Sequence, residues 1–204
     1  MSDSTVKSAE PALAPRRRRV AVVHHFWAHY RTAVMRELAQ NGRHEYVFVG
    51  AATDPTGSVK PADAGAIPSD RRIFAPVRLL PPKKTILWQT GLLRLAFRRD
   101  IDTIILLGHV AFPATWLCTI LARLLGKRVL FWTHGYTRED HGLKRLLRKT
   151  FYKLPHALMF YGHYGKCVAI RMGFDPQRIH VLYNSLDLAA QRAGAGDRHA
   201  RATR

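Results

Sequence analysis

The feature that most constrains the fold of this chain is a series of short apolar runs rich in β-branched residues. Each run has the length of a β-strand, and together they cover 19–25, 45–49, 72–77, 102–107, 128–133, 156–161 and 179–183. The first run, Arg-Val-Ala-Val-Val-His-His, shows no alternation of polar and apolar residues. That pattern is typical of a strand buried on both faces of a parallel sheet.

Helical patterns separate most of these runs. The spacing of apolar residues, with glycine after several of the segments, predicts helices over 29–40, 85–99, 113–125, 138–153 and 163–172. Strands that alternate with helices predict an α/β, Rossmann-like three-layer domain with a mostly parallel sheet of about seven strands. We expect the domain to span 19–187, between a disordered basic leader (1–18) and a disordered tail (188–204).

One segment has the length of a membrane span. Residues 103–122 contain no Asp, Glu, Lys or Arg, but Gly108 and Pro113 interrupt them, so we expect a strand and then a buried helix. No signal peptide is apparent. Cys118 and Cys167 lack metal-binding spacing and are expected to be buried, reduced thiols. These features predict a cytoplasmic protein.

Ligands of open α/β sheets bind beyond the carboxyl ends of the strands. In this chain the segments that follow the strands are rich in histidine, and we expect a cleft formed by His25, Tyr30, Arg31, His109, His134 and Gly135. The His134 ring comes one residue after a buried strand. It can hydrogen-bond a hydroxyl or move a proton, or it can simply pack at the strand end.

Several functional classes have no motif in this chain. It contains no GxGxxG, GxxxxGK[ST] or GxSxG sequence, which argues against nicotinamide enzymes, P-loop hydrolases and α/β-hydrolases. The histidines in 24–29 have no Asp, Glu or Cys at ligand spacing, so we expect no metal and no cofactor.

The segment 173–187 resembles the one that ends the N-terminal domain of family-4-like retaining glycosyltransferases. Matching residues are Gly173, Arg178, Ile179, Val181, Asn184, Leu186 and Asp187, whereas Ser185 replaces the usual glycine. His134-Gly135 resembles the strand-end histidine of that family, and Tyr30-Arg31 resembles some members at that position. The resemblance covers about 20–187. A Gly-Gly pair that often follows the first strand in the family is replaced by His25-Phe26-Trp27.

The resemblance implies a domain that binds the acceptor of a sugar transfer. It places His134, as the candidate catalytic residue, near the transferred sugar, and His25, Tyr30 and Arg31 on the acceptor side. It makes Asn184 and Asp187 the hinge to a second Rossmann domain. That second domain would bind the nucleotide-sugar donor, and nothing after Asp187 resembles it.

We therefore expect the N-terminal half of a glycosyltransferase of the two-domain GT-B type, inactive alone, whose acceptor is lipid-linked or a cell-envelope polysaccharide. The residues leave a second interpretation open, which is a non-enzymatic module that docks on a separate donor-domain chain or on an anionic membrane.

The charge of the chain favours anionic partners. The net charge is +19, and the first 19 and last 14 residues carry +3 each, so +13 belongs to the body. One predicted helix carries cations on one side and leucines on another, and the cations are Lys144, Arg145, Arg148 and Lys149. Such a helix suits an anionic membrane surface, although an ordinary solvated face over a core has the same pattern.

A second cationic patch is expected around Arg78, Lys83, Lys84, Arg94, Arg98 and Arg99, with Trp88 and Leu92. The resemblance supports peripheral binding at the inner face of the plasma membrane. We find no helix-turn-helix, RNA-recognition or zinc signature, and so do not expect nucleic acid as a partner.

Overall fold

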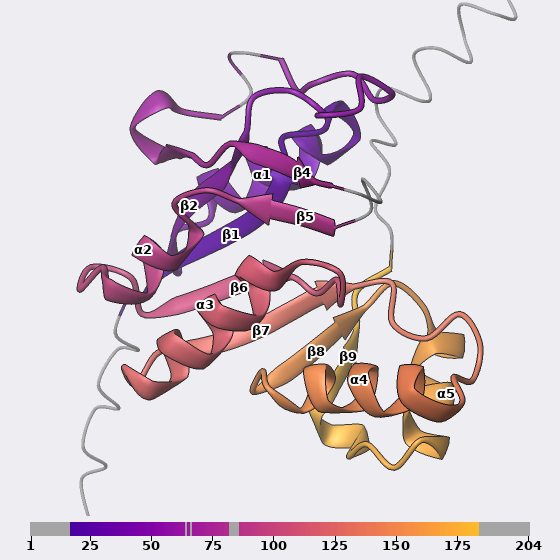
Figure 1. The fold of residues 1–204 in the computed structure, drawn as a ribbon. Coiled ribbons are helices and arrows are strands. Elements are labelled where there is room, and N and C mark those ends of the chain that lie inside the picture. Colours follow the sequence, from indigo (N-terminus) through magenta and orange to yellow (C-terminus); the bar gives the residue numbers. More distant parts are fainter. Residues whose placement is uncertain (1–16, 64, 66, 82–85, 184–204) are drawn as a thin grey trace, which may run out of the picture.

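The computed structural model describes residues 17–63, 65, 67–81 and 86–183. Seven strands form the main sheet in the order β3-β2-β1-β6-β7-β8-β9, and all six neighbouring pairs are parallel (Figure 1). They are β1 (Arg19–Phe26), β2 (Glu45–Ala51), β3 (Arg72–Phe74), β6 (Thr103–Leu107), β7 (Arg128–Thr133), β8 (Ala157–Phe160) and β9 (Ile179–Val181). The α/β fold with a parallel sheet of seven strands is thus confirmed.

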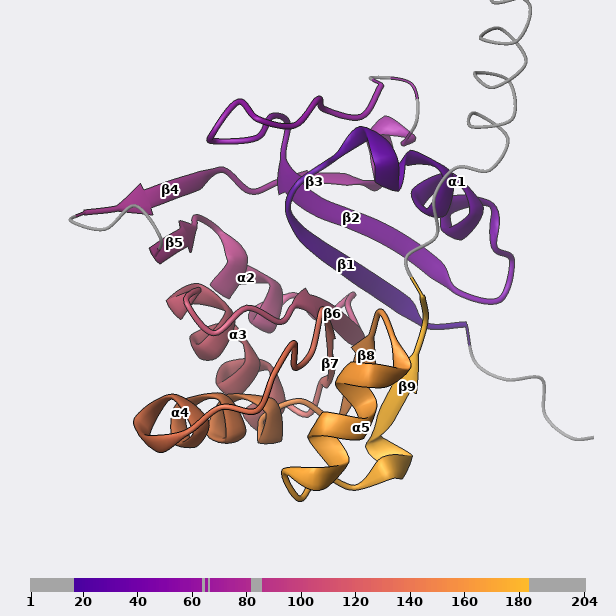
Figure 2. The ribbon, with the colours of Figure 1, turned by 90° about the vertical axis from the view of Figure 1, so that its right-hand side faces the viewer.

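Helices cover both faces of the sheet, so the domain has three layers. They are α1 (Thr32–Gln40), α2 (Leu92–Phe97), α3 (Pro113–Leu124), α4 (Gly142–Lys153) and α5 (His163–Arg171). Short 3-10 turns occupy His29–Arg31, Ser69–Arg71 and Pro176–Arg178. Figure 2 shows α1 on one side of the sheet and α2, α3 and α4 on the other.

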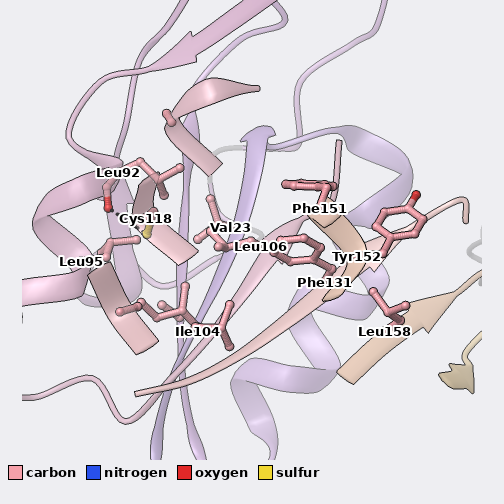
Figure 3. Close-up of a cluster of buried hydrophobic side chains, with 14 of the residues drawn as sticks. Val23, Leu92, Leu95, Ile104, Leu106, Cys118, Phe131, Phe151, Tyr152 and Leu158 are labelled. Atoms are coloured by element: carbon pink, nitrogen blue, oxygen red, sulfur yellow. Dashed lines mark hydrogen bonds between the residues drawn. The ribbon is translucent and has the colours of Figure 1, made fainter. Parts of the chain in front are cut away.

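The inner parts of the strands are mostly apolar because both faces of the sheet are covered. In β1, Ala21 and Val23 face the larger core with α2 to α5, whereas Val20 and Val22 face the smaller core beside α1. Figure 3 shows the larger core, where Leu92 and Leu95 of α2 pack near Val23 and Leu106. Burial at both faces removes the alternation that a half-exposed strand shows.

The helix expected over 85–99 is mostly wrong. Its first part is a strand, β5 (Ile86–Gln89), which pairs antiparallel with β4 (Val77–Leu80), and only α2 is helical. Burial alternates along β5, with Leu87 and Gln89 buried, which is the period of a strand. Gly91, in the left-handed region at φ 82°, separates strand from helix. Leu92 is fully buried and therefore belongs to no surface patch.

Two further expectations need correction. The helix expected from 138 begins at Gly142, whose φ of 55° turns the chain into α4 after the buried carboxylate of Asp140. Cys118 is a buried free thiol as expected, whereas Cys167 is exposed on α5.

The uncharged segment 103–122 is divided between β6 and α3, and none of the described helices is long and apolar enough to cross a membrane.

The leader and tail, the hinge residues Asn184 and Asp187, and Lys83 and Lys84 fall outside the described residues, apart from the end of the leader at 17–18.

Candidate functional site

The candidate site lies at the carboxyl ends of β1, β6, β7 and β8. The chain runs outward from β1 to β2 in one direction and from β6 to β7 in the other, so β1 and β6 mark the switch point of the sheet. A cavity of about 170 Å³ opens there. Five of the six expected cleft residues line it, namely His25, Tyr30, Arg31, His109 and His134.

Arg31 is the charged centre of this cleft. Only 8% of the residue is exposed, and its guanidinium carbon lies 4.6 Å from the ring centroid of Trp132 and 5.1 Å from that of Tyr161. The guanidinium also donates a hydrogen bond to the Tyr161 hydroxyl. None of the ion pairs between described residues includes Arg31. Its positive charge therefore acts on the histidines around it.

The histidines of the cleft are held in the neutral form. Burial, followed by the charges of Arg31 and His25, lowers the pKa of His24 to about 3. Burial and then Arg31 lower the pKa of His134, and burial is also the main cause that lowers the pKa of His25 and of His109. A neutral imidazole offers one donor and one acceptor, which suits the hydroxyl groups of a ligand.

His134 is directed into the cleft by the glycine that follows it. Gly135 has φ 76°, and a Cβ atom there would lie 2.9 Å from the ring of Phe160. The chain therefore turns sharply after β7 and leaves the His134 ring 4.6 Å from that of Tyr161, edge to face. Gly135 itself does not line the cavity. The positive φ and the nearby ring of Phe160 account for a glycine at this position.

His109 enters the cleft because β6 and β7 approach closely. A Cβ atom at Gly108 would lie 2.9 Å from the Cβ atom of Phe131, so only glycine fits next to β7 at this point. The His109 ring then stacks on Phe112 at 4.4 Å, and both rings line the cavity.

The structure adds residues that sequence reasoning assigned no role. His24, Phe112 and Tyr161 line the cavity. His24 lies near the end of β1, and Phe112 and Tyr161 come after β6 and β8, and this position near strand ends was the available signal. Gln89 supports the cleft from behind, because its amide donates to the carbonyl of His24 at 2.8 Å and to that of Ala75 at 3.3 Å. Because a helix was expected over 85–99, this contact of Gln89 could not be predicted.

A second, wider groove shares His109 with the cleft. Its volume is about 620 Å³, and its walls come from β5, the loop after β6, α3 and α4. Apolar side chains such as Trp116, Leu117 and Leu147 line most of it, while Lys144 and Arg148 stand on one side.

The cations expected to form a membrane patch on α4 are only partly free. Lys144 Nζ lies 3.2 Å from Oδ1 of the buried Asp140, and Arg148 Nε lies 2.8 Å from Oδ2 of the same carboxylate. The outward face of α4 carries Leu143, Leu146 and Leu147, which are 79%, 63% and 48% exposed. These leucines are therefore not part of the hydrophobic core. The residues of α4 that are buried in the core are Phe151 and Tyr152.

The described residues contain no group of three or more His, Cys, Asp or Glu side chains placed to hold a metal ion.

Comparison with known proteins supports the family resemblance. The model of Glycosyltransferase Family 4 matches residues 28–190. A search of curated proteins finds no match. Among solved structures, the lipopolysaccharide outer core galactosyltransferase WaaB in its apo form is 11% identical, with a TM-score of 0.52, over 81% of this chain and 45% of that one.

Two epimerase structures have the same fold. A putative UDP-N-acetylglucosamine 2-epimerase from Listeria monocytogenes has a TM-score of 0.54 at 11% identity, over 80% of this chain and 44% of that one. The UDP-GlcNAc 2-epimerase from Methanocaldococcus jannaschii has a TM-score of 0.51 at 11% identity, over 81% and 45%. At such identities the likeness shows the fold alone. The chain spans less than half the length of each of these structures.

Proposed function

This chain belongs to glycosyltransferase family 4, and we propose that it forms the acceptor-binding half of an enzyme that transfers a sugar from a nucleotide-sugar to an acceptor. The observation that carries the proposal is the cleft at the switch point of the sheet, where neutral histidines and Tyr30 offer hydrogen bonds to hydroxyl groups. Because the chain spans under half of the solved structures it matches, we assign the nucleotide-sugar to a second domain.

In this proposal His134 lies beside the transferred sugar. Its ring is exposed at the cleft wall and leans against Tyr161, and it stays neutral near pH 7 because burial and Arg31 lower its pKa. A neutral ring can hydrogen-bond a sugar hydroxyl, which contributes about 0.5–1.5 kcal/mol, or up to about tenfold in rate, when the bond forms only in the transition state.

The test of this role is a transfer assay with radiolabelled nucleotide-sugar, in which the chain is joined by its donor-binding domain. We expect His134→Ala to lower kcat/KM about two- to tenfold, since it removes a polar contact to the sugar. His180→Ala is the matched control, because His180 is exposed on β9 and does not line the cleft. Equal activity of the two variants would refute the assigned role.

We further propose that α4 and the apolar groove rest on an anionic lipid surface that holds a lipid-linked acceptor. The support is the combination of three exposed leucines on α4, the apolar groove behind them, and the net charge of +19. Leucines insert into the acyl boundary while Lys and Arg attract anionic headgroups. The groove shares His109 with the cleft, so a lipid bound there would lie next to the acceptor site.

Co-sedimentation with vesicles tests the membrane proposal. We expect the chain to bind phosphatidylglycerol vesicles and to be released by salt, and the double variant Leu143→Gln, Leu146→Gln to bind less. Phe74→Gln is the control, because Phe74 is similarly exposed at 64% on β3, far from α4 in the sheet order. Unchanged binding of the leucine variant, or no binding at low salt, would disprove the proposal.

A further inference from the structure

We infer that the cleft contains a subsite for an anionic group of the acceptor, a phosphate or carboxylate, with Arg31 as its counter-charge. The assignment of this group to the acceptor rests on the proposed function, whereas the existence of an anion subsite rests on the structure of the cleft itself.

The first argument is the burial of Arg31. A guanidinium does not lose its proton in proteins, so a residue only 8% exposed must keep its charge away from most of the surrounding water. The aromatic faces of Trp132 and Tyr161 compensate part of that cost. Among the described residues, the Tyr161 hydroxyl is the only hydrogen-bond partner of the Arg31 guanidinium, which leaves most of its five N–H donors for a ligand.

The second argument is that no carboxylate lines the cavity. Its lining consists of histidine, aromatic and aliphatic residues and Arg31. Asp54 is the acid that acts on His25, but its carboxylate already accepts hydrogen bonds from the backbone of Thr56, Ser58 and Val59. At His24 and His134 the charge of Arg31 adds to the effect of burial, and both lower the pKa of these two histidines. A cavity whose wall carries a cation and no carboxylate favours an anion.

The third argument is an unused polar atom. Nδ1 of His25 is buried without a hydrogen-bond partner among the described residues, and its ring lines the same cavity as Arg31. A buried polar group without a partner costs about 1–3 kcal/mol, so its pairing with a ligand oxygen would be favourable. Arg31, His25 and His134 all line the cavity, so each can contribute a donor to the same ligand.

In a sugar transfer, the phosphate group bound by Arg31 could belong either to the acceptor or to the diphosphate of the donor. We choose the acceptor because Arg31 reaches toward Trp132 and Tyr161, at the ends of β7 and β8, where His134 also stands. At the end of β1, where the family often has a Gly-Gly pair, this chain has the buried side chains of Phe26 and Trp27.

Isothermal titration of the whole chain at about 150 mM salt tests the subsite, since this salt suppresses non-specific binding to a basic chain. The probes are inorganic phosphate, glucose 1-phosphate, UDP and, as the neutral probe, glucose. We expect glucose 1-phosphate to bind at least as tightly as UDP and much more tightly than glucose. Arg31→Gln should weaken it by about tenfold or more, in keeping with the loss of a buried charge contact.

The matched control is Arg36→Gln, because Arg36 is exposed on α1, one turn beyond Arg31. If Arg31→Gln does not fold, Tyr161→Phe keeps the ring and removes the hydroxyl that holds Arg31, and we expect a several-fold loss. Equal weakening by Arg36→Gln, or no phosphate binding at all, would overturn the subsite. Tighter, Arg31-dependent binding of UDP would overturn its assignment to the acceptor. None of these binding results depends on the transfer assay. The anion subsite and the proposed transferase function can therefore fail independently of each other.

Discussion

At the scale of single residues, His24 illustrates how the cleft couples stability to pH. Its ring is buried 5.4 Å from that of Trp132, and burial followed by Arg31 and His25 lowers its pKa to about 3. In the unfolded chain the same ring has a pKa near 6.5. Between these two values the unfolded state binds more protons, so the contribution of His24 to stability is full above pH 6.5 and declines as the pH falls toward 3.

We therefore predict that folding stability falls by about 2 kcal/mol through His24 alone between pH 7 and pH 5, since each pKa unit corresponds to about 1.4 kcal/mol. Urea unfolding of the wild type and of His24→Leu at both pH values measures this term. The variant should show a smaller loss between the two pH values. An equal loss in both proteins would contradict the low pKa of His24.

Gly135 allows a second prediction at this scale. Gly135→Ala introduces a Cβ atom at positive φ and against the ring of Phe160. Gly126 has a similar φ of 75°, but nothing lies within 4 Å of the position of its Cβ atom. Gly126→Ala should lower the free energy of unfolding by about 1 kcal/mol through backbone strain alone. Gly135→Ala should lower it by about 1–3 kcal/mol more, because its methyl group also overpacks against Phe160. Equal costs in thermal unfolding would show that Phe160 moves aside freely.

At the scale of elements, the strands of the main sheet could be predicted because continuous apolar runs such as 19–25 have few alternative structures. The hairpin of β4 and β5 could not be, because Ile86–Gln89 is short and its burial alternates only once the strand is paired. Short apolar runs are ambiguous between helix and strand, and here the tertiary pairing decides. The start of α4 was also misplaced, since the burial of Asp140 depends on side chains of the helix itself.

The cleft could be predicted to a similar extent and for a similar reason. His25, His109 and His134 follow strands, and parallel strands bring their carboxyl ends to one edge. The burial of Arg31 against Trp132 and Tyr161 could not be predicted. It depends on how the segment before α1 packs against residues at the ends of β7 and β8, which are distant in the sequence.

Gln89 provides the prediction for the hairpin. Gln89→Ala removes the two hydrogen bonds that tie β5 to the carbonyls of His24 and Ala75, and leaves both buried acceptors with one partner fewer. We expect a loss of about 1–3 kcal/mol in urea unfolding. Gln40→Ala, at the exposed end of α1, should change stability by less than about 0.5 kcal/mol. A Gln89 variant as stable as the Gln40 variant would show that the hairpin does not depend on this contact.

At the scale of the whole molecule, one α/β domain carries a histidine-rich cleft and, beside it, an apolar groove next to the leucine-rich helix α4. The family match covers most of the chain, whereas the solved structures of the same fold are more than twice as long as the part matched. We therefore propose that this domain binds the acceptor and that another domain binds the nucleotide-sugar.

The measurement that tests this division most directly is sugar transfer from labelled UDP- and GDP-sugars to a membrane lipid extract. The chain is assayed alone and then together with a separate Rossmann domain that binds the nucleotide-sugar. We predict no turnover by the chain alone and clear turnover by the two domains together. Turnover by the chain alone would contradict the assignment of the donor to a second domain, and no turnover by the combination would contradict the proposed function.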